Sequence, residues 1–362
     1  MNPTRQPEAA YLPAGSSPMV HGQASINLRR RAFVRMAASA AAAGLLAGCS
    51  TMRRTVGYRP PATERTAFVV SNEGFFVVAV DPSYRPTVTL ETATSQWSLD
   101  LAGLDGRLRR IGYDDLTARA KRSVHYTLEC IGNPVGGSLI GNARWNVIPL
   151  KEILRQSSSG VATARSVRFE GLDGFYSSVS IERAMDDYAF LAVGMNGVPL
   201  PLAHGFPARV LLPDLYGKKQ PRWLKRISLS EDPRTTSYWE QYGWAGEVPV
   251  KTTSRFDQLD RVPAGRTTTL SGIAFSGRRG ISRVEVSIDS LDKWKPCALA
   301  SDPAPNIWCL WRYHWESPTP GRYVLWVRAI DGAGHVQTRR EQGSFPDGAT
   351  GLHRIEVSVG GA

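Results

Sequence analysis

Apolar and polar residues alternate with a period of two along the last third of this 362-residue chain. In residues 281–289, Val284, Val286 and Ile288 fall on one face of an extended segment, and the residues between them are polar. This alternation is typical of a half-buried β-strand. It recurs in three further segments, 267–276, 308–316 and 322–331. Several such strands separated by Gly, Pro and Asp turns predict a β-sandwich of immunoglobulin type over residues 252–362.

The pattern differs between residues 67 and 251, where strand-like and helix-like segments interleave. Three apolar, Val-, Phe- and Thr-containing segments predict strands: 67–71, 75–80 and 87–93. Two others predict short helices: 113–120 and 149–157. Interleaving of this kind indicates an α+β domain over residues 67–251. Two domains also fit a chain that is too long for one hydrophobic core.

The first 48 residues are predicted to be an export signal, outside either domain. Arg29–Arg31 precede an apolar, Ala-rich run, Met36–Gly48, which is too short to span a bilayer. A basic segment followed by a short apolar one is typical of such signals. Residues 30–35 resemble the twin-arginine signal, which is read by a transporter of folded proteins.

Leu46–Cys49 resembles a bacterial lipobox, in which the cysteine is lipidated and becomes the mature N-terminus. Residues 49–66 lack apolar periodicity, contain Pro60-Pro61 and are predicted to be a tether. Together these features predict a protein on the periplasmic side of a bacterial envelope, held to the membrane only by a lipid anchor on Cys49. A plain cleavable signal with a chance cysteine is the alternative.

The chain is basic, with 44 Lys and Arg against 32 Asp and Glu. Residues 1–48 hold five of these cations and one of these anions, so the remainder has 39 against 31, a net charge of about +8. The basic residues are scattered singly, which argues against nucleic-acid binding. A cationic face instead suits a small anionic substrate or an acidic partner.

Three cysteines remain besides Cys49. Cys297 and Cys309 lie on the two arms of a predicted hairpin, and a disulfide between them is plausible in an exported protein. Cys130 opens the Gly- and Pro-rich loop "CIGNPVGG" without an evident partner. The His and Cys spacings do not match a zinc site. A catalytic pair of Cys130 with His125 or His204 stays formally possible, although the signatures of cysteine hydrolases are missing around Cys130.

Several motifs, taken in order, resemble one family. The segments "TLECIGNPVGG", "VRFEGLD", "LAHGFPARVLLPDLYGKKQPRWLKRISL" and "SYWEQYGW" are similar to the molybdopterin domain of the sulfite oxidase family. The segment "GIAFSGRRGISRVEVSIDSLDKWKPCAL" resembles that family's immunoglobulin-like dimerisation domain. The resemblance runs with gaps from about Ala67 to Val359. It implies a sulfite-oxidase-like α+β molybdopterin domain followed by an immunoglobulin-like sandwich, and a possible homodimer.

The resemblance also implies a set of site residues. Cys130 would ligate molybdenum, which agrees with the softness of a thiolate ligand. The residues expected to hold Mo-molybdopterin are Asn72, Phe75, Cys130, Asp173, His204, Arg209, Gln220, Pro221 and Arg222. Trp145 matches a substrate-pocket tryptophan and fits a core position equally well. Trp244 stands where the family usually has a tyrosine, and an indole N–H donates a hydrogen bond without acting as a phenolic acid.

Two departures bear on the substrate. Pro134 and Val135 stand where sulfite oxidases carry an arginine after the ligand cysteine, and Ser71 precedes Asn72 where another arginine is expected. Since a hydrogen bond to a charged group contributes about 1.5–3 kcal/mol, losing two would weaken sulfite binding by orders of magnitude. Arg144, or an arginine of the second domain, is a candidate to compensate.

The function expected from the resemblance is oxygen-atom transfer at molybdenum, with oxidation of sulfite or a related sulfur compound as the leading hypothesis. The sequence has neither a haem-binding CxxCH motif nor a segment like cytochrome b5, so electrons are expected to leave to a separate cytochrome or quinone-linked protein. A reductase acting on a neutral sulfoxide or similar oxide is the enzymatic alternative. A cofactor-free binding lipoprotein of the envelope is the non-enzymatic one.

Overall fold

The computed structural model describes residues 67–362 apart from 82, 258, 260–261, 317 and 361–362. The predicted export signal, the lipidated Cys49 and the tether over residues 49–66 therefore lie outside the described residues. Among the residues that are described, no helix combines the length and the apolar character that crossing a membrane requires.

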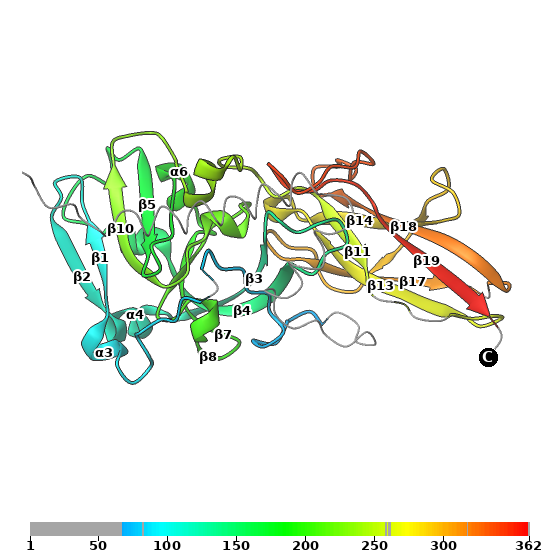
Figure 1. Cartoon of the computed structure of the whole chain (residues 1–362), viewed down its shortest axis with the longest axis horizontal. Coiled ribbons are helices and arrows are strands. Elements are labelled where there is room, and N and C mark those ends of the chain that lie inside the picture. Colours follow the sequence, from blue (N-terminus) through cyan, green and yellow to red (C-terminus); the bar gives the residue numbers. More distant parts are fainter. Residues whose placement is uncertain (1–66, 82, 258, 260–261, 317, 361–362) are drawn as a thin grey trace, which may run out of the picture. The chain divides into compact units, whose positions relative to one another are not determined.

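The first sheet has the strand order β2-β1-β10-β5-β6 (Figure 1). Its strands are β1 (Ser98–Ala102), β2 (Leu108–Gly112), β5 (Ser166–Gly171), β6 (Tyr176–Ser180) and β10 (Leu224–Ser230). β1 and β10 pair in parallel, and the other neighbours pair antiparallel. Because apolar residues alternate in β1, Leu99 and Leu101 are fully buried against Phe169 and Ile227 in the core of the domain.

The second sheet carries most of the segments that reach the site. Its order is β3-β4-β7-β8, and β9 also pairs with β7. The strands are β3 (Arg122–Glu129), β4 (Ile140–Pro149), β7 (Phe190–Met195), β8 (Val198–Pro199) and β9 (Arg209–Leu211). All six residues of β7 are buried, so this strand is a rigid support for the edge strand β9 beside it.

Helices are short in this domain. The α-helices are α3 (Ala93–Gln96), α4 (Tyr113–Arg119), α5 (Leu150–Leu154) and α6 (Ile181–Ala184), and the 3₁₀ turns are η1 (Leu202–His204), η2 (Gly217–Lys219) and η3 (Tyr238–Tyr242). The helices predicted at 113–120 and 149–157 are confirmed as α4 and α5. The expected α+β character is therefore present, with sheet in excess of helix.

The three strands predicted at 67–71, 75–80 and 87–93 are wrong. These segments are irregular, and α3 begins where the last of them ends. Side-chain amides bind their backbone instead of a strand ladder: Asn142 of β4 donates to the Phe68 carbonyl, and Asn196, in the turn between β7 and β8, donates to the Val70 carbonyl. Their apolar residues are used to cover the core, into which Phe75 is buried.

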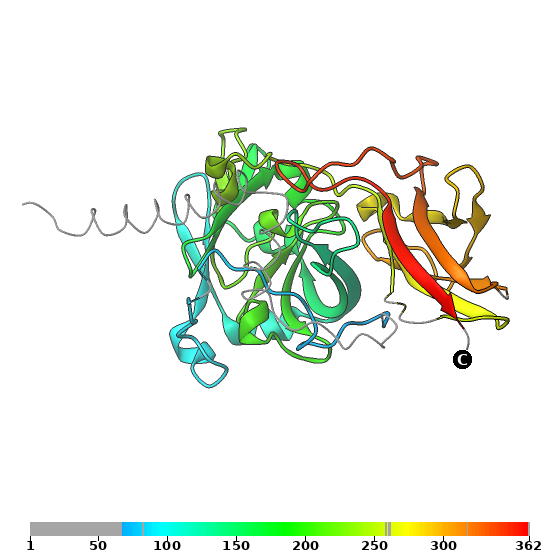
Figure 2. The same cartoon turned by 45° about the vertical axis from the view of Figure 1, so that its right-hand side comes forward.

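The second domain is the predicted sandwich of two antiparallel-rich sheets. One has the order β11-β13-β17-β16 and the other β12-β19-β18-β14-β15. The strands are β11 (Thr253–Phe256), β12 (Val262–Pro263), β13 (Thr268–Phe275), β14 (Ile281–Ile288), β15 (Lys295–Pro296), β16 (Ala298–Leu299), β17 (Cys309–Trp315), β18 (Gly321–Asp331) and β19 (His353–Gly360), and η4 is Gly277–Arg279. β18 and β19, orange and red in Figure 2, run side by side. Val286, Trp311 and Leu325 meet in the core between the sheets.

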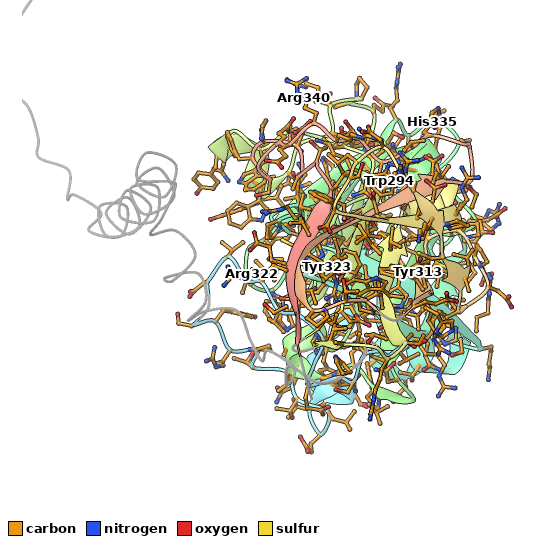
Figure 3. All side chains as sticks on the ribbon, turned by 90° about the vertical axis from the view of Figure 1, so that its right-hand side faces the viewer. Trp294, Tyr313, Arg322, Tyr323, His335 and Arg340 are labelled. Atoms are coloured by element: carbon orange, nitrogen blue, oxygen red, sulfur yellow. The ribbon has the colours of Figure 1, made fainter. Side chains whose placement is uncertain are left out.

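One face of β14 departs from its predicted exposure. The polar residues Glu285 and Ser287 are 8% and 1% exposed. The Ser287 hydroxyl donates to the Lys293 carbonyl (2.6 Å), and Glu285 pairs with Arg328 (2.6 Å). Trp294, labelled in Figure 3, packs on the Arg328 guanidinium at 4.1 Å. The segment around Trp294 therefore covers the face that alternation alone assigns to solvent.

The predicted disulfide between Cys297 and Cys309 is wrong, because both cysteines are free. The register of β16 and β17 pairs Ala298 with Arg312 and Leu299 with Trp311. Cys309 consequently falls beside Ser301, and its thiol contacts the Ser301 carbonyl at 3.4 Å. Cys297 and Cys309 are therefore not opposite each other in this register.

Candidate active site

Cys130 follows β3, at the point where the chain enters the loop that leads to β4. Its N–H donates to the Leu139 carbonyl, and its carbonyl accepts from the Asn133 N–H, both at 2.9 Å. The Gly132 N–H lies 3.4 Å from its sulfur. Burial raises the pKa of the thiol to about 11, although the Gly132 N–H opposes this shift. A metal ion displaces such a proton on binding, so the loop presents a fixed soft ligand.

Asn133 closes the Cys130 loop. Its Nδ2 donates to Glu129 Oε1, and its Oδ1 accepts from the Leu139 N–H, each at 2.9 Å. Burial raises the pKa of the Glu129 carboxyl to about 8. Sequence reasoning missed both residues, because alternation does not reveal that both faces of β3 become buried toward its end.

His204 meets the N-terminal segment of the domain. Its Nε2 lies 2.6 Å from the Asn72 carbonyl oxygen, and Phe75 contacts the imidazole edge-on at 5.6 Å between ring centroids. Burial lowers the pKa of His204 to about 4, so the ring is neutral at pH 7 and donates its Nε2 proton to that carbonyl. Asn72 Oδ1 in turn accepts from Asn196 Nδ2 (2.9 Å). Three residues predicted to hold the cofactor, namely Asn72, Phe75 and His204, are thus brought together.

Arg209 begins β9 and is only 5% exposed. Its guanidinium donates to the His204 carbonyl (3.0 Å) and lies over the Trp145 ring at 5.2 Å. Its Nε has no hydrogen-bond partner among the described residues. Burial lowers the pKa of the guanidinium to about 9. A buried, incompletely bonded cation of this kind is a fitting partner for an anionic ligand.

Trp145 lies in β4 with its side chain fully buried. Its indole N–H donates to the Tyr126 carbonyl (3.0 Å), and Phe75 packs edge-on against it at 5.8 Å. The structure therefore places Trp145 in the core, which is the second of its two interpretations. From there it supports the Arg209 guanidinium.

Arg222 and Arg209 approach each other across Gly205. Gly205 has φ +116°, and a Cβ on it would lie 3.0 Å from the Cβ of Arg222 and 3.1 Å from that of Arg209. Glycine is required here both for the backbone angle and for the close approach. Arg222 donates to the carbonyls of Ala203 (2.6 Å) and Val78 (2.8 Å). The two arginines predicted for the cofactor therefore share one neighbourhood.

Asp173 lies in the turn between β5 and β6, where its Oδ1 accepts from the Phe175 N–H (3.1 Å). Burial raises the pKa of its carboxyl, against the Phe175 N–H and the positive charges of Arg222 and Lys225. The charge interaction with Arg222 brings this predicted cofactor residue to the same neighbourhood.

The segment Leu215–Arg222, here called the cofactor loop, is braced from within. Gln220 Oε1 accepts from the Leu212 N–H (3.0 Å), and its Nε2 donates to the Leu215 carbonyl (2.6 Å). The Pro221 carbonyl accepts from the Val210 N–H (3.0 Å). Both polar atoms of the Gln220 side chain therefore bond to the backbone and hold the loop in shape, rather than facing a ligand.

Lys218 is a residue of the cofactor loop that sequence reasoning missed. It is 6% exposed, and its Nζ has no hydrogen-bond partner in the part of the chain that the structure describes. Burial, together with the neighbouring Lys219 charge, lowers the pKa of this ammonium to about 8. Lys219 differs, since it is paired with Glu240 at 2.7 Å and bonded to the Ser178 carbonyl. The sequence feature that could have pointed to Lys218 is the pair of adjacent lysines in a segment bounded by Gly and Pro.

Trp244 follows η3 and is half-buried. Its ring contacts Phe345 of the second domain edge-on at 5.3 Å. It also packs against an apolar cluster that contains Ile131, the residue after Cys130. The structure thus connects Trp244 with the Cys130 loop through Ile131, whereas Trp145 belongs to the core of the first domain.

A polar hollow of about 10 Å³ lies beside the Cys130 loop, enough for about one water molecule. Its lining includes Glu129, Pro134 and Val135 of the first domain and Gln337 of the second. Lys251 also lines it and is paired with Asp347 (3.1 Å). No arginine of the described residues is part of this lining. Arg144, a candidate to replace the missing arginines, is exposed on β4 away from it.

These residues fit a molybdenum-pterin cofactor. The Cys130 thiol is a soft ligand, and the unpartnered groups of Arg209 and Lys218 suit the phosphate of such a cofactor. The pairs of Cys130 with His125 or His204 find no support, since His125 contacts Phe68 and His204 is bonded to Asn72. The fold and the site together define a molybdopterin-dependent oxidoreductase.

Comparison with known proteins agrees with this class. Residues 86–239 match the family model of the oxidoreductase molybdopterin binding domain, and residues 249–359 match that of the Mo-co oxidoreductase dimerisation domain. Sulfite oxidase of Gallus gallus is 30% identical over 331 residues, covering 77% of this chain and 70% of the relative. The mitochondrial sulfite oxidase of Mus musculus is 28% identical over 327 residues. The chain belongs to the sulfite oxidase family of molybdopterin oxidoreductases, and its cofactor is Mo-molybdopterin.

The solved structure of the sulfane dehydrogenase SoxCD from Paracoccus pantotrophus has the same fold, with a TM-score of 0.69 over 83% of this chain and 86% of that one. At 18% identity this match shows the fold alone. It confirms the molybdopterin domain followed by a β-sandwich. The chain spans 59% of the length of the mouse enzyme.

Proposed function

We propose that this protein is an exported oxidoreductase that oxidises sulfite or a related sulfur compound and passes the electrons to a separate acceptor protein. The observation that carries the proposal is the Cys130 loop, which holds a half-buried thiol in place, in a domain that also contains the incompletely bonded cations of Arg209 and Lys218. The relatives that are named sulfite oxidases support the choice of substrate class.

Each side chain would have a distinct task. The Cys130 thiolate would hold molybdenum, while Arg209 and Lys218 would hold the anionic part of the pterin. When bound, the molybdenum-pterin group supplies two-electron chemistry coupled to oxygen-atom transfer. His204, neutral at pH 7, would keep Nδ1 as an acceptor toward the cofactor. Trp244 would donate its indole N–H to a substrate oxygen and exclude water from that side.

Export, anchoring and assembly belong to the same proposal. The arginine pair and apolar run of residues 29–48, followed by Cys49, support a lipid-anchored protein on the periplasmic side. A cofactor inserted before export would explain a signal for folded proteins. The match to a dimerisation domain supports a homodimer. The electron acceptor would be a cytochrome or a quinone-linked protein.

The test is molybdenum and pterin content of the exported protein, followed by sulfite-dependent reduction of ferricyanide or a c-type cytochrome. Cys130→Ala is expected to lose bound metal and all turnover. Cys309→Ala is the matched control, because it removes a buried free thiol of the second domain. A metal-loaded protein that leaves sulfite untouched would overturn the choice of substrate.

A specific observation favours a second candidate, a reductase of a neutral sulfoxide or similar oxide. Pro134 and Val135 line the hollow beside the Cys130 loop, and the one cation there, Lys251, is already paired. Such a lining suits a neutral ligand better than an anion. Sulfoxide reduction with a reduced dye, without sulfite turnover, would establish this reading. Val135→Arg is then expected to raise kcat/KM for sulfite by about tenfold or more, since a charged hydrogen bond contributes about 1.5–3 kcal/mol.

A further inference from the structure

We propose that Asp214 is a positioning residue through which the second domain fixes the cofactor loop, so that cofactor retention depends on this contact. The inference goes beyond the proposed substrate and rests only on the cofactor. Asp214 lies between β9, which begins with Arg209, and the cofactor loop, which ends with Arg222. Its position therefore determines where both arginine-bearing segments lie.

Asp214 has a backbone conformation that needs support. Its φ is +60°, a left-handed value that few non-glycine residues adopt. The surroundings hold it there, since its carbonyl accepts from the Val250 N–H (3.0 Å) and its own N–H donates to Asn306 Oδ1 (3.0 Å). An uncommon backbone conformation that several contacts hold at a site segment points to a positional role.

The η4 turn of the second domain binds the Asp214 carboxylate. Oδ1 accepts from the Arg278 N–H (3.2 Å) and lies 3.6 Å from the Arg279 guanidinium. Gly277 permits this approach, because a Cβ at that position would lie 2.2 Å from Asp214 Oδ1. Glycine is therefore required at position 277, because any larger residue would collide with the Asp214 carboxylate.

Arg279 joins the two domains through one guanidinium. It is bonded to Asp331 of β18 at 2.8 Å and to the Val250 carbonyl at 2.7 Å, and it faces Asp214. Asp331 is 1% exposed, so its carboxylate is a fixed anchor within the sandwich. The Asp214 carboxylate is therefore tied to the second sheet of the sandwich through a single residue.

Asn306 extends the same contact to the segment that bears Cys130. Its N–H donates to the Gly277 carbonyl (2.8 Å), and its carbonyl accepts from the Thr127 N–H (2.9 Å). Thr127 lies in β3, three residues before Cys130. One buried residue of the second domain consequently touches both the strand that ends at the metal ligand and the start of the cofactor loop.

The experiment compares Asp214→Asn with Asp186→Asn. Both substitutions remove a carboxylate that faces η4, because Asp186 pairs with the Arg278 side chain, but only Asp214 adjoins the cofactor loop. Asparagine tolerates the left-handed backbone, so Asp214→Asn removes the charge without a backbone penalty. Molybdenum and pterin per chain are measured for each protein, together with the melting temperature of the cofactor-free form.

Asp214→Asn is expected to lower molybdenum and pterin occupancy about tenfold, the scale on which outer partners of metal ligands act, while Asp186→Asn keeps wild-type occupancy. Equal occupancy in all three proteins would overturn the proposal. Equal loss in both variants would do so as well, because it would indicate a general effect of domain contact.

Asn306→Gly provides a second, milder test. It keeps the left-handed backbone of Asn306 and its bond to Thr127 but deletes the acceptor for the Asp214 N–H. We expect it to lower cofactor occupancy as well, and to shift the Mo(V) electron paramagnetic resonance signal of the fraction that stays loaded. Full occupancy with a wild-type signal refutes the proposal, even if Asp214→Asn fails to fold. Sulfite turnover enters neither readout, so the two proposals fail independently.

Discussion

Replacing Arg209 by methionine is expected to stabilise the cofactor-free protein while abolishing cofactor retention. Burial lowers the pKa of the guanidinium from its ordinary value to about 9. At pH 7, which is below both pKa values, the guanidinium is charged in the folded and in the unfolded state. The full free-energy cost of burying that charge therefore opposes folding. It amounts to roughly 5 kcal/mol.

Two contacts offset part of this penalty. The hydrogen bond to the His204 carbonyl contributes about 1–2 kcal/mol, and the contact with the Trp145 ring about 1–2 kcal/mol. Methionine has a similar length and packs against Trp145 without a charge to desolvate. The net gain expected for cofactor-free Arg209→Met is therefore about 2 kcal/mol in the free energy of unfolding.

The assay is urea denaturation of both proteins made in a host that lacks the cofactor, with molybdenum and pterin content measured after expression in a competent host. Arg234→Met is the control, because the Arg234 side chain is 83% exposed and pairs only on the surface with Asp232. The control is expected to change neither quantity. A cofactor-free Arg209→Met protein that is less stable than wild type, or one that loads molybdenum normally, contradicts the reasoning.

Three further predictions concern pH, packing and redox state. Burial lowers the pKa of His204 to about 4, so on acidification the unfolded chain binds a proton at this residue before the folded chain does. The free energy of unfolding should therefore fall by about 3 kcal/mol between pH 6.5 and 4. Urea titrations of His204→Gln should show a flatter dependence on pH. Gly136→Ala should lower the melting temperature by several degrees, since φ is +74° and the new Cβ would lie 2.2 Å from His353. Because Cys297 and Cys309 are free, the urea midpoint should be the same with and without reductant, and a difference would reveal a disulfide.

The sequence predicted the sandwich well, because a period of two is preserved wherever one face of a strand is buried. It failed for residues 67–93, since an apolar segment that covers a core has the same composition as a strand. Side-chain amides such as Asn142, which bind the backbone there, are invisible to periodicity. The prediction of a disulfide between Cys297 and Cys309 failed for a related reason, because the register of a hairpin depends on the exact length of its loop.

The residues of the candidate site likewise fall into those that the sequence predicts and those that it does not. Cys130, His204 and Arg209 are recognisable from their motifs, and the structure supplies the neighbours that explain them. Lys218 and Asn133 were missed because their importance depends on burial and on missing partners, which only the folded chain shows. Contacts made by the second domain could not be predicted from the sequence either, since they join distant residues: Asp214 and Arg278 are 64 positions apart, and Asp214 and Asn306 are 92.

The charges of the site suggest why cofactor and fold belong together. Lys219 is fully buried but paired with Glu240, so it is balanced within the chain. Arg209 and Lys218 are also buried, with donors that lack partners among the described residues. Burying such cations opposes folding unless an anion meets them. An anionic cofactor removes that cost only in the folded state, and a ligand that binds only this state stabilises it. The second domain, which fixes Asp214 at the start of the same loop, would then hold the segments that bear these cations in place until the cofactor binds.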